Sequence, residues 1–228
     1  MNTNSIISDI RNIASSGSNP IEYKIEDSQI LFWVNETRSM LISQALKARQ
    51  DISDTWVQVI TCLSLDQVDK SECCLVNTNC FVLRTRVKLP RTIETSYDNT
   101  IIRVTKPDGT IIPKRTAFSS LYNSYSKYAK DKAYWYLKDD YIYVVNEDLL
   151  ETINVWGLFE NPSELSTFVA CSGTPCFSLE SSYPCSLKMA SDITNIVIKT
   201  KVYPYLQLPA DNRNDGVNNP DVQSNIKQ

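Results

Sequence analysis

Hydrophobic residues recur with a helical period near both ends of the chain. Between Ile6 and Ala14 they are spaced three and four residues apart, which predicts a short helix. A longer helix is expected over about 27–49. The same period returns from about Leu187, and Pro204 and Pro209 are expected to stop this last helix because proline cannot donate a backbone hydrogen bond.

The start of the longer helix carries two local signals. Asp27 and Ser28 offer side-chain oxygens that could cap the first turn. Ile25 is placed to pack against Ile30 across that turn, as in a hydrophobic staple. We therefore expect the helix to begin at these residues.

In the middle of the chain the hydrophobic period changes to two. From Phe81 to Leu89, apolar residues and threonine alternate with basic residues up to Pro90, which predicts a half-buried strand with Trp56–Leu65 as its partner. Turn residues separate further β-rich runs and predict two hairpins and one more strand. These are Ile101–Thr105 with Thr110–Ile112, Tyr134–Leu137 with Tyr141–Val145, and Ile153–Phe159.

Helices therefore bracket an antiparallel β insertion, and the expected fold class is α+β with a helical bundle built from both ends of the chain. The stretch from Asn161 to Pro184 has no clear period and is expected to be a loop with a short helix near Pro162–Leu165. The expected divisions of this one globular unit are N-terminal helices 1–54, a β insertion 55–160, a Cys-rich loop 161–185, a C-terminal helix 186–208 and a polar tail 209–228.

Composition narrows the function further. The net charge is −3, which does not supply the basic surface that tight nucleic-acid binding requires. No apolar run reaches the roughly 18 residues of a membrane span, and the first helix carries Asp9 and Arg11, unlike a signal peptide. We expect a soluble protein that is made in the cytoplasm and has no membrane partner.

The sequence holds no histidine, so imidazole bases, imidazole metal ligands and histidine-activated nucleophiles are excluded. The spaced glycines of a phosphate-binding loop are also missing. The adjacent carboxylates Asp139–Asp140 and Glu147–Asp148 are interpreted as solvated turn residues. No catalytic residue and no cofactor are expected, although carboxylate or thiol chemistry stays open.

Seven cysteines form an odd set, which does not suit a secreted disulfide framework. Neither Cys73, Cys74 and Cys80 nor the group at 171–185 has the paired spacing of a zinc site, so no metal is expected. Mostly reduced thiols that pack as small hydrophobic side chains are favoured, with a single disulfide formed outside the cell as the alternative.

Four ordered segments resemble the head-to-tail adaptor or ring proteins of crAss-like short-tailed phages, which are related to the tail tubular adaptors of other short-tailed phages. They are Asp27–Arg38, Val87–Arg91, Val155–Leu165 and Leu208–Gly216, within a coverage of about 20–219. The Cys-rich stretch at 171–185 departs from the pattern.

The resemblance implies a non-enzymatic virion protein at the portal vertex. It would form a ring, commonly of about twelve copies, that joins the portal protein to further ring or tail proteins and lets genomic DNA pass without sequence-specific binding. A cytosolic phage enzyme that uses Cys or carboxylate chemistry, and a monomeric assembly chaperone or binding module, are the alternatives.

Contact residues are expected where exposure, tyrosine content or polarity favours an interface. Tyr122, Tyr125 and Tyr128 are interleaved with Lys127, Lys130 and Lys132, a pattern that also occurs on nucleic-acid-binding surfaces. The overall acidity of the chain disfavours that alternative. The candidates are Asp108, Gly109, Tyr122, Tyr125, Tyr128, Leu208, Pro209, Asp211, Asn214 and Asp215.

Overall fold

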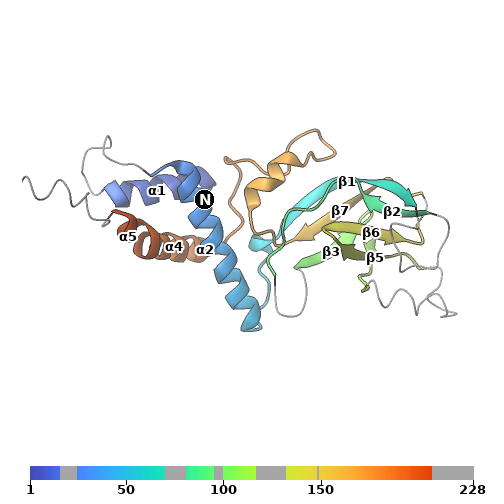
Figure 1. The fold of residues 1–228 in the computed structure, drawn as a ribbon, viewed down its shortest axis with the longest axis horizontal. Coiled ribbons are helices and arrows are strands. Elements are labelled where there is room, and N and C mark those ends of the chain that lie inside the picture. The colour runs from blue at the N-terminus through green and yellow to red at the C-terminus, as the bar shows by residue number, and fades with distance from the viewer. Residues whose placement is uncertain (16–24, 70–80, 95–99, 117–131, 148, 207–228) are drawn as a thin grey trace, which may run out of the picture.

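In a computed structural model, the chain forms an elongated subunit with a helical part at one end and a β-sheet part at the other (Figure 1). The structure describes residues 1–15, 25–69, 81–94, 100–116, 132–147 and 149–206. The mixture of helices and an antiparallel sheet confirms the α+β class.

The helical part joins the two ends of the described chain. It contains α1 (Thr3–Ser15), α2 (Asp27–Lys47), α4 (Leu187–Val197), the π-helix η5 (Ile198–Val202) and α5 (Tyr203–Leu206). α1, α2 and α4 contact one another, but α2 runs across the other two in Figure 1. The expected bundle arrangement is therefore not confirmed, although both ends of the chain do supply helices that pack together.

The start of α2 differs from its expected cap. Glu26 is the N-cap residue and makes no side-chain capping bond, while Asp27 is already helical. The Asp27 carboxylate instead pairs with Arg11 of α1, and the Ser28 hydroxyl donates to a Glu26 carboxylate oxygen at 3.1 Å. The capping prediction was wrong because both side chains have other partners. Ile25 and Ile30 are both buried in the same apolar core, as a staple requires.

The last helical run continues past Pro204, the first of the two prolines expected to stop it. Pro204 lies inside the helical run, as the second residue of α5. The preceding π-helix shifts the hydrogen-bond register, so that the Tyr203 amide donates to the Ile198 carbonyl. A new α-helical segment then begins at Tyr203, and proline is tolerated at the start of a helix because the first amides have no intrahelical acceptor.

Among the described residues, seven strands form one sheet in the order β4-β3-β7-β1-β2-β6-β5. Every neighbouring pair in it is antiparallel. The strands are β1 (Gln58–Asp69), β2 (Phe81–Thr85), β3 (Ile101–Thr105), β4 (Ile111–Ile112), β5 (Tyr134–Lys138), β6 (Tyr141–Val145) and β7 (Thr152–Gly157). A 3-10 turn, η2 (Asp54–Trp56), leads into β1, and another, η4 (Pro162–Thr167), follows β7.

The two edges of this sheet approach each other and nearly close a barrel. Beyond β4, Lys114 forms a parallel bridge with Trp135 of the other edge strand, β5. The Trp135 amide donates to the Pro113 carbonyl at 3.0 Å, and the Arg115 amide donates to the Trp135 carbonyl at 2.8 Å. Backbone groups at both edges are thus partly satisfied within the subunit, which reduces their capacity to pair with another chain.

β2 is shorter than the expected strand to Leu89. The chain bends at Arg86, Val87 becomes exposed, and the Leu89 amide donates to the Asp140 carbonyl in the β5–β6 turn. Leu89, the last apolar residue of the alternating pattern, is therefore buried by packing against a turn and not by strand pairing. In that turn, Asp139 and Asp140 have φ values of 52° and 65°, which fits a tight hairpin turn and explains the adjacent carboxylates.

One continuous apolar core runs from the helices into the barrel. It includes Ile10 of α1, Ile30 of α2 and Ile193 of α4, together with Val155 of β7 and Trp135 of β5. The helical and β parts are therefore packed as one unit.

Candidate assembly surfaces

Arg38 of α2 ties the helical part to the barrel. Its side chain is fully buried, and its Nε donates to the Pro184 carbonyl, just before α4, at 2.8 Å. The two terminal nitrogens donate to the Phe159 carbonyl at 2.8 Å and to the Trp56 carbonyl at 3.0 Å. Phe159 follows β7 and Trp56 precedes β1, so a single guanidinium group holds both connections to the barrel against the helices.

A second set of bonds reinforces this junction. The Tyr183 hydroxyl donates to Asn35 Oδ1 at 2.6 Å, and Asn35 Nδ2 donates to Asn161 Oδ1 at 2.9 Å. Ser39 Oγ donates to the Glu160 carbonyl at 3.1 Å. Together these side chains from α2 make the relative orientation of the two parts a fixed feature of the subunit.

Burial dominates the electrostatics of the junction. It lowers the pKa of Arg38, while the nearby Tyr183 acts in the opposite direction. Burial also raises the pKa of Tyr183 well above its ordinary value of 10.0 and raises the pKa of Cys185. The tyrosine and the thiol are therefore neutral at physiological pH, and nothing in this shift activates Cys185 as a nucleophile.

An open groove of about 550 Å³ lies beside this junction, between α2 and the start of η4. Leu31 and Phe32 line it from α2, and Phe32 is 61% exposed. The other side is formed by Arg91, Glu160, Asn161, Ser163 and Glu164. The groove thus combines an exposed aromatic ring with charged side chains.

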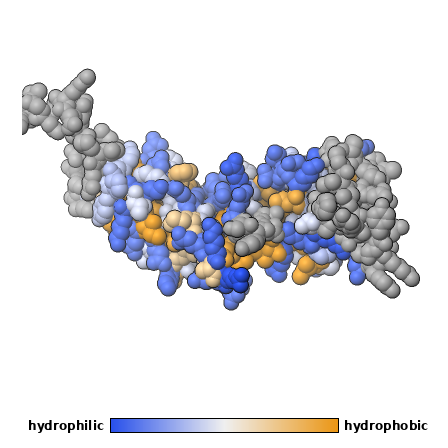
Figure 2. Space-filling view, turned by 60° about the horizontal axis from the view of Figure 1, so that its bottom comes forward, coloured by the Kyte–Doolittle hydropathy of each residue, from blue (hydrophilic) through white to orange (hydrophobic). Residues whose placement is uncertain are grey.

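The β3–β4 hairpin exposes a different set of side chains. Ile102 of β3 is 42% exposed and Ile111 of β4 is 61% exposed. At the tip, Gly109 has a φ of 89°, and Asp108 Oδ1 accepts a bond from the Thr110 amide at 2.8 Å. Asp108 and Gly109 are therefore exposed in a well-defined turn, and the Thr110 bond lowers the pKa of Asp108. In Figure 2, separate apolar areas appear over the helical part and beside the barrel.

A comparison of the sequence with protein families decides the class of protein. The model of the crAss-like phage family described as phage tail ring protein 2 matches residues 5–221. The chain belongs to this family. A comparison with curated proteins gave no match. The family match confirms the resemblance to ring proteins and covers the helical part and the barrel together.

Two of the ten expected contact residues of this tail ring protein lie in the described part of the chain. Asp108 and Gly109 lie at the tip of the β3–β4 hairpin. The remaining candidates fall outside the described residues, and their role as contacts stays a prediction. These are Tyr122, Tyr125, Tyr128, Leu208, Pro209, Asp211, Asn214 and Asp215.

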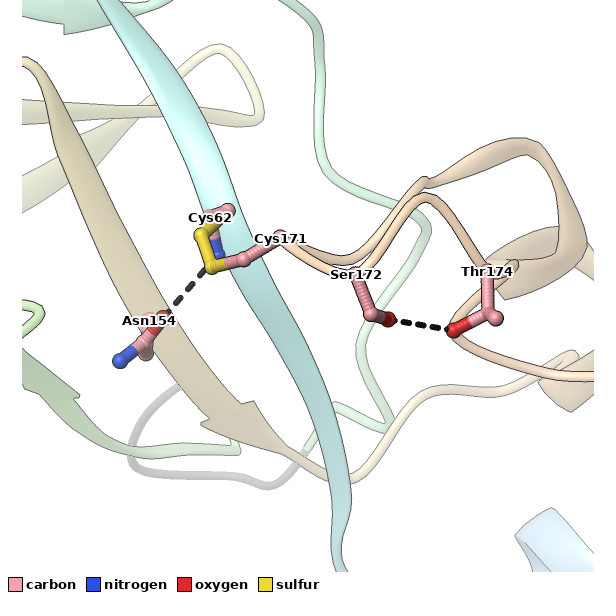
Figure 3. Close-up of a disulfide and its surroundings, with 5 residues drawn as sticks. All are labelled: Cys62, Asn154, Cys171, Ser172 and Thr174. Atoms are coloured by element: carbon pink, nitrogen blue, oxygen red, sulfur yellow. Dashed lines mark hydrogen bonds between the residues drawn. A yellow bond between two sulfur atoms is a disulfide. The ribbon is translucent and has the colours of Figure 1, made fainter.

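A disulfide fastens the Cys-rich loop of the ring protein to the sheet. Cys62 and Cys171 are joined, with 5.3 Å between their Cα atoms (Figure 3). Cys62 has a φ of 55° and lies in an irregularity of the β1–β7 pairing, where its amide donates to Asn154 Oδ1 at 3.0 Å. Such a bulge redirects a side chain, here toward the loop. Cys176 and Cys185 are free thiols, and Cys73, Cys74 and Cys80 lie outside the described residues.

Two other kinds of feature are absent from the described part of the ring protein. Within the residues that the structure describes, no three metal-ligating side chains of the His, Cys, Asp or Glu type gather in one place. The same part of the chain contains no helix that is both long and apolar enough to span a membrane.

The Arg38 junction and the Phe32 groove were both missed by the sequence interpretation. It assigned α2 a stripe of apolar residues that starts at Ile30, whereas Asn35 and Arg38 are also buried. The sequence did carry one signal: Val34 and Arg38 are four residues apart, so they share one face of the helix. That spacing does not identify the partners of the arginine.

Proposed function

We propose that this chain is a non-enzymatic structural subunit of the virion. Its ring connects the portal protein at the capsid vertex to further ring or tail proteins, with about twelve copies around one axis. Genomic DNA passes through the lumen during packaging and ejection. The family match supports the phage tail ring character, and the connector position is our proposal.

The rigid two-part subunit is the observation that carries this proposal. A closed ring requires two different surfaces on each copy, held at a fixed angle so that the rotation between neighbours repeats. Arg38 and its three carbonyl partners hold the helical part and barrel in one orientation. Exposed apolar side chains, such as Phe32 on the helical part and Ile111 on the barrel, are available on both.

The charge of the chain supports passive passage of DNA. A net charge of −3 disfavours tight, salt-dependent binding to phosphates. A lumen with a dense Lys and Arg lining would contradict this part of the proposal. Electron microscopy of the assembled ring would identify the lumen residues.

Quantitative proteomics of purified virions tests the function directly. We expect the protein to be present at about twelve copies per particle, together with the portal protein. A protein found only in the lysate of infected cells would contradict the virion role and favour an enzyme or an assembly chaperone.

A further inference from the structure

We propose that the groove between α2 and η4 receives the β3–β4 hairpin of the next copy in the ring. This contact rests on the proposed function, because it assumes that the chain assembles with itself. The groove and the hairpin are complementary in both apolar character and charge.

The groove has an apolar wall and an acidic rim. Phe32 is 61% exposed, and Leu31 beside it is half-buried. Glu36, Glu160 and Glu164 line the groove together with Arg91, so three acidic groups against one basic group give a charge of −2. Lys201, outside the lining, pairs with Glu36 at 2.9 Å.

The two remaining carboxylates keep the groove acidic. Neither Glu160 nor Glu164 forms an ion pair with any residue in the described part of the chain; Glu164 accepts a bond from the Asn161 amide group at 3.3 Å. A basic, apolar partner would therefore gain both buried surface and charge pairing in this groove.

The hairpin has the opposite charge. Residues 101–112 contain Arg103 and Lys106 against Asp108, a charge of +1, and Lys114 and Arg115 directly after β4 raise the charge of residues 101–115 to +3. Ile102 and Ile111 add exposed apolar surface, at 42% and 61%.

Contacts within the subunit fix the hairpin in place before it meets a partner. Arg103 lies 4.4 Å from the centre of the Trp156 ring, and Lys106 pairs with Glu147 at 2.8 Å. The Asp108 bond to the Thr110 amide fixes the tip. A surface that is ordered before binding loses little entropy on docking.

The geometry points to a neighbouring copy as the occupant. In the view of Figure 1, η4 lies above the sheet and β3 lies along the lower part of the sheet, so the groove and the hairpin lie on different sides of one subunit. A contact between two different surfaces of identical chains is head-to-tail and can continue around a ring. Pro113 and Arg115, directly after β4, already form backbone hydrogen bonds with Trp135 of the other edge strand, so the docking relies on side chains and not on strand addition.

Two single substitutions in the full-length protein test the contact. Phe32→Lys removes the aromatic wall and makes the groove less acidic, and Ile111→Asp places a carboxylate in the hairpin, while Leu149→Asp, at a side chain that is 93% exposed and outside both surfaces, is the matched control. All three positions are exposed enough for the variants to fold, which circular dichroism verifies. We expect Phe32→Lys and Ile111→Asp each to weaken self-association at least about ten-fold, and the control to assemble normally, as measured by native mass spectrometry.

Mixing the two variants gives a sharper readout. A Phe32→Lys copy keeps its hairpin and an Ile111→Asp copy keeps its groove, so one intact contact remains in each mixed pair. We expect the mixture to form one-to-one dimers and no closed rings. Rings that tolerate both substitutions, or a mixture that forms no dimers, would overturn the contact and leave the ring function standing. A wild-type protein that stays monomeric would contradict the ring function itself.

Discussion

The Tyr183 hydroxyl lies 2.6 Å from Asn35 Oδ1 and donates a hydrogen bond to it, although the two residues are 148 positions apart in the chain. Tyr183 is 2% exposed and Asn35 is 8% exposed. Asn35 in turn donates to Asn161, which follows β7. The two hydrogen bonds together connect α2 with the segment before α4 and with the segment after the last strand of the barrel. The stability of the junction therefore depends on polar groups that have almost no access to water.

Tyr183→Phe should destabilise the folded chain by about 1 kcal/mol at neutral pH. The substitution keeps the ring but leaves Asn35 Oδ1 without its buried donor. Urea denaturation of both proteins would measure the difference. Tyr141→Phe, at a partly exposed ring of the barrel, is the control and should change the free energy of unfolding less. Equal losses in the two variants would contradict the role of the junction.

The same tyrosine should make the protein sensitive to alkaline pH. Burial raises the pKa of Tyr183 in the folded state above its ordinary value of 10.0, so above that pH the unfolded chain loses this proton first. The contribution of Tyr183 is therefore complete below pH 10 and is lost as the pH rises above it, by up to about 1.4 kcal/mol per pH unit. Denaturation at pH 8 and above pH 10 should show that the stability gap between wild type and Tyr183→Phe narrows. A constant gap would contradict the raised pKa.

Arg38→Met should be more damaging, with a loss of about 3 kcal/mol or more. Methionine fills much of the volume but leaves three carbonyl oxygens without their donor. Arg38→Lys should recover little, because an ammonium group cannot reproduce the planar fork of the guanidinium group. Lys47→Met, on an exposed position of the same helix, is the matched control and should stay near wild type in thermal denaturation. A stable Arg38→Met protein would show that packing alone holds the two parts together.

The helices and most strands followed from the sequence because their signals are local. The periods around Ile6 and Ile193, the Pro107–Gly109 turn and the β-branched and aromatic residues of β6 depend on residues that are neighbours in the chain. Even the short helical turn after Asn161 was predictable, since its cap and Pro162 are adjacent.

The features that join distant segments did not follow from the sequence. The burial of Arg38 depends on Pro184, which is 146 positions away, and no local pattern reveals such a partner. Likewise the closure of the sheet depends on Trp135 meeting the stretch after β4. Pro204 misled the sequence interpretation because the π-helix before it changes the hydrogen-bond register, which a propensity rule does not anticipate.

Reduction of the Cys62–Cys171 disulfide should lower the stability of the folded chain by about 2–4 kcal/mol, since the bond closes a long loop in the unfolded chain. Urea denaturation with and without a thiol reductant would measure this loss. In the Cys62→Ser, Cys171→Ser double variant the reductant should have no comparable effect. Mass spectrometry of a non-reduced digest should find the two peptides joined. A wild-type protein with the same stability in both conditions would contradict a structural role for the bond.

Removal of the polar tail should separate assembly from folding. A chain that ends at Leu208 keeps every residue of the described apolar core, so its thermal denaturation should match that of the full-length protein. Residues 209–228 are rich in Asn, Asp and Gln and cannot bury a core of their own, which suits a segment that orders on a neighbour. We therefore expect the truncated protein to be incorporated more weakly into portal-bound complexes, as measured by sedimentation and gel quantification. Replacing residues 209–228 by a Gly/Ser segment of equal length is the control for chain length and should be equally defective. Normal incorporation of either variant would refute a role of the tail in ring attachment.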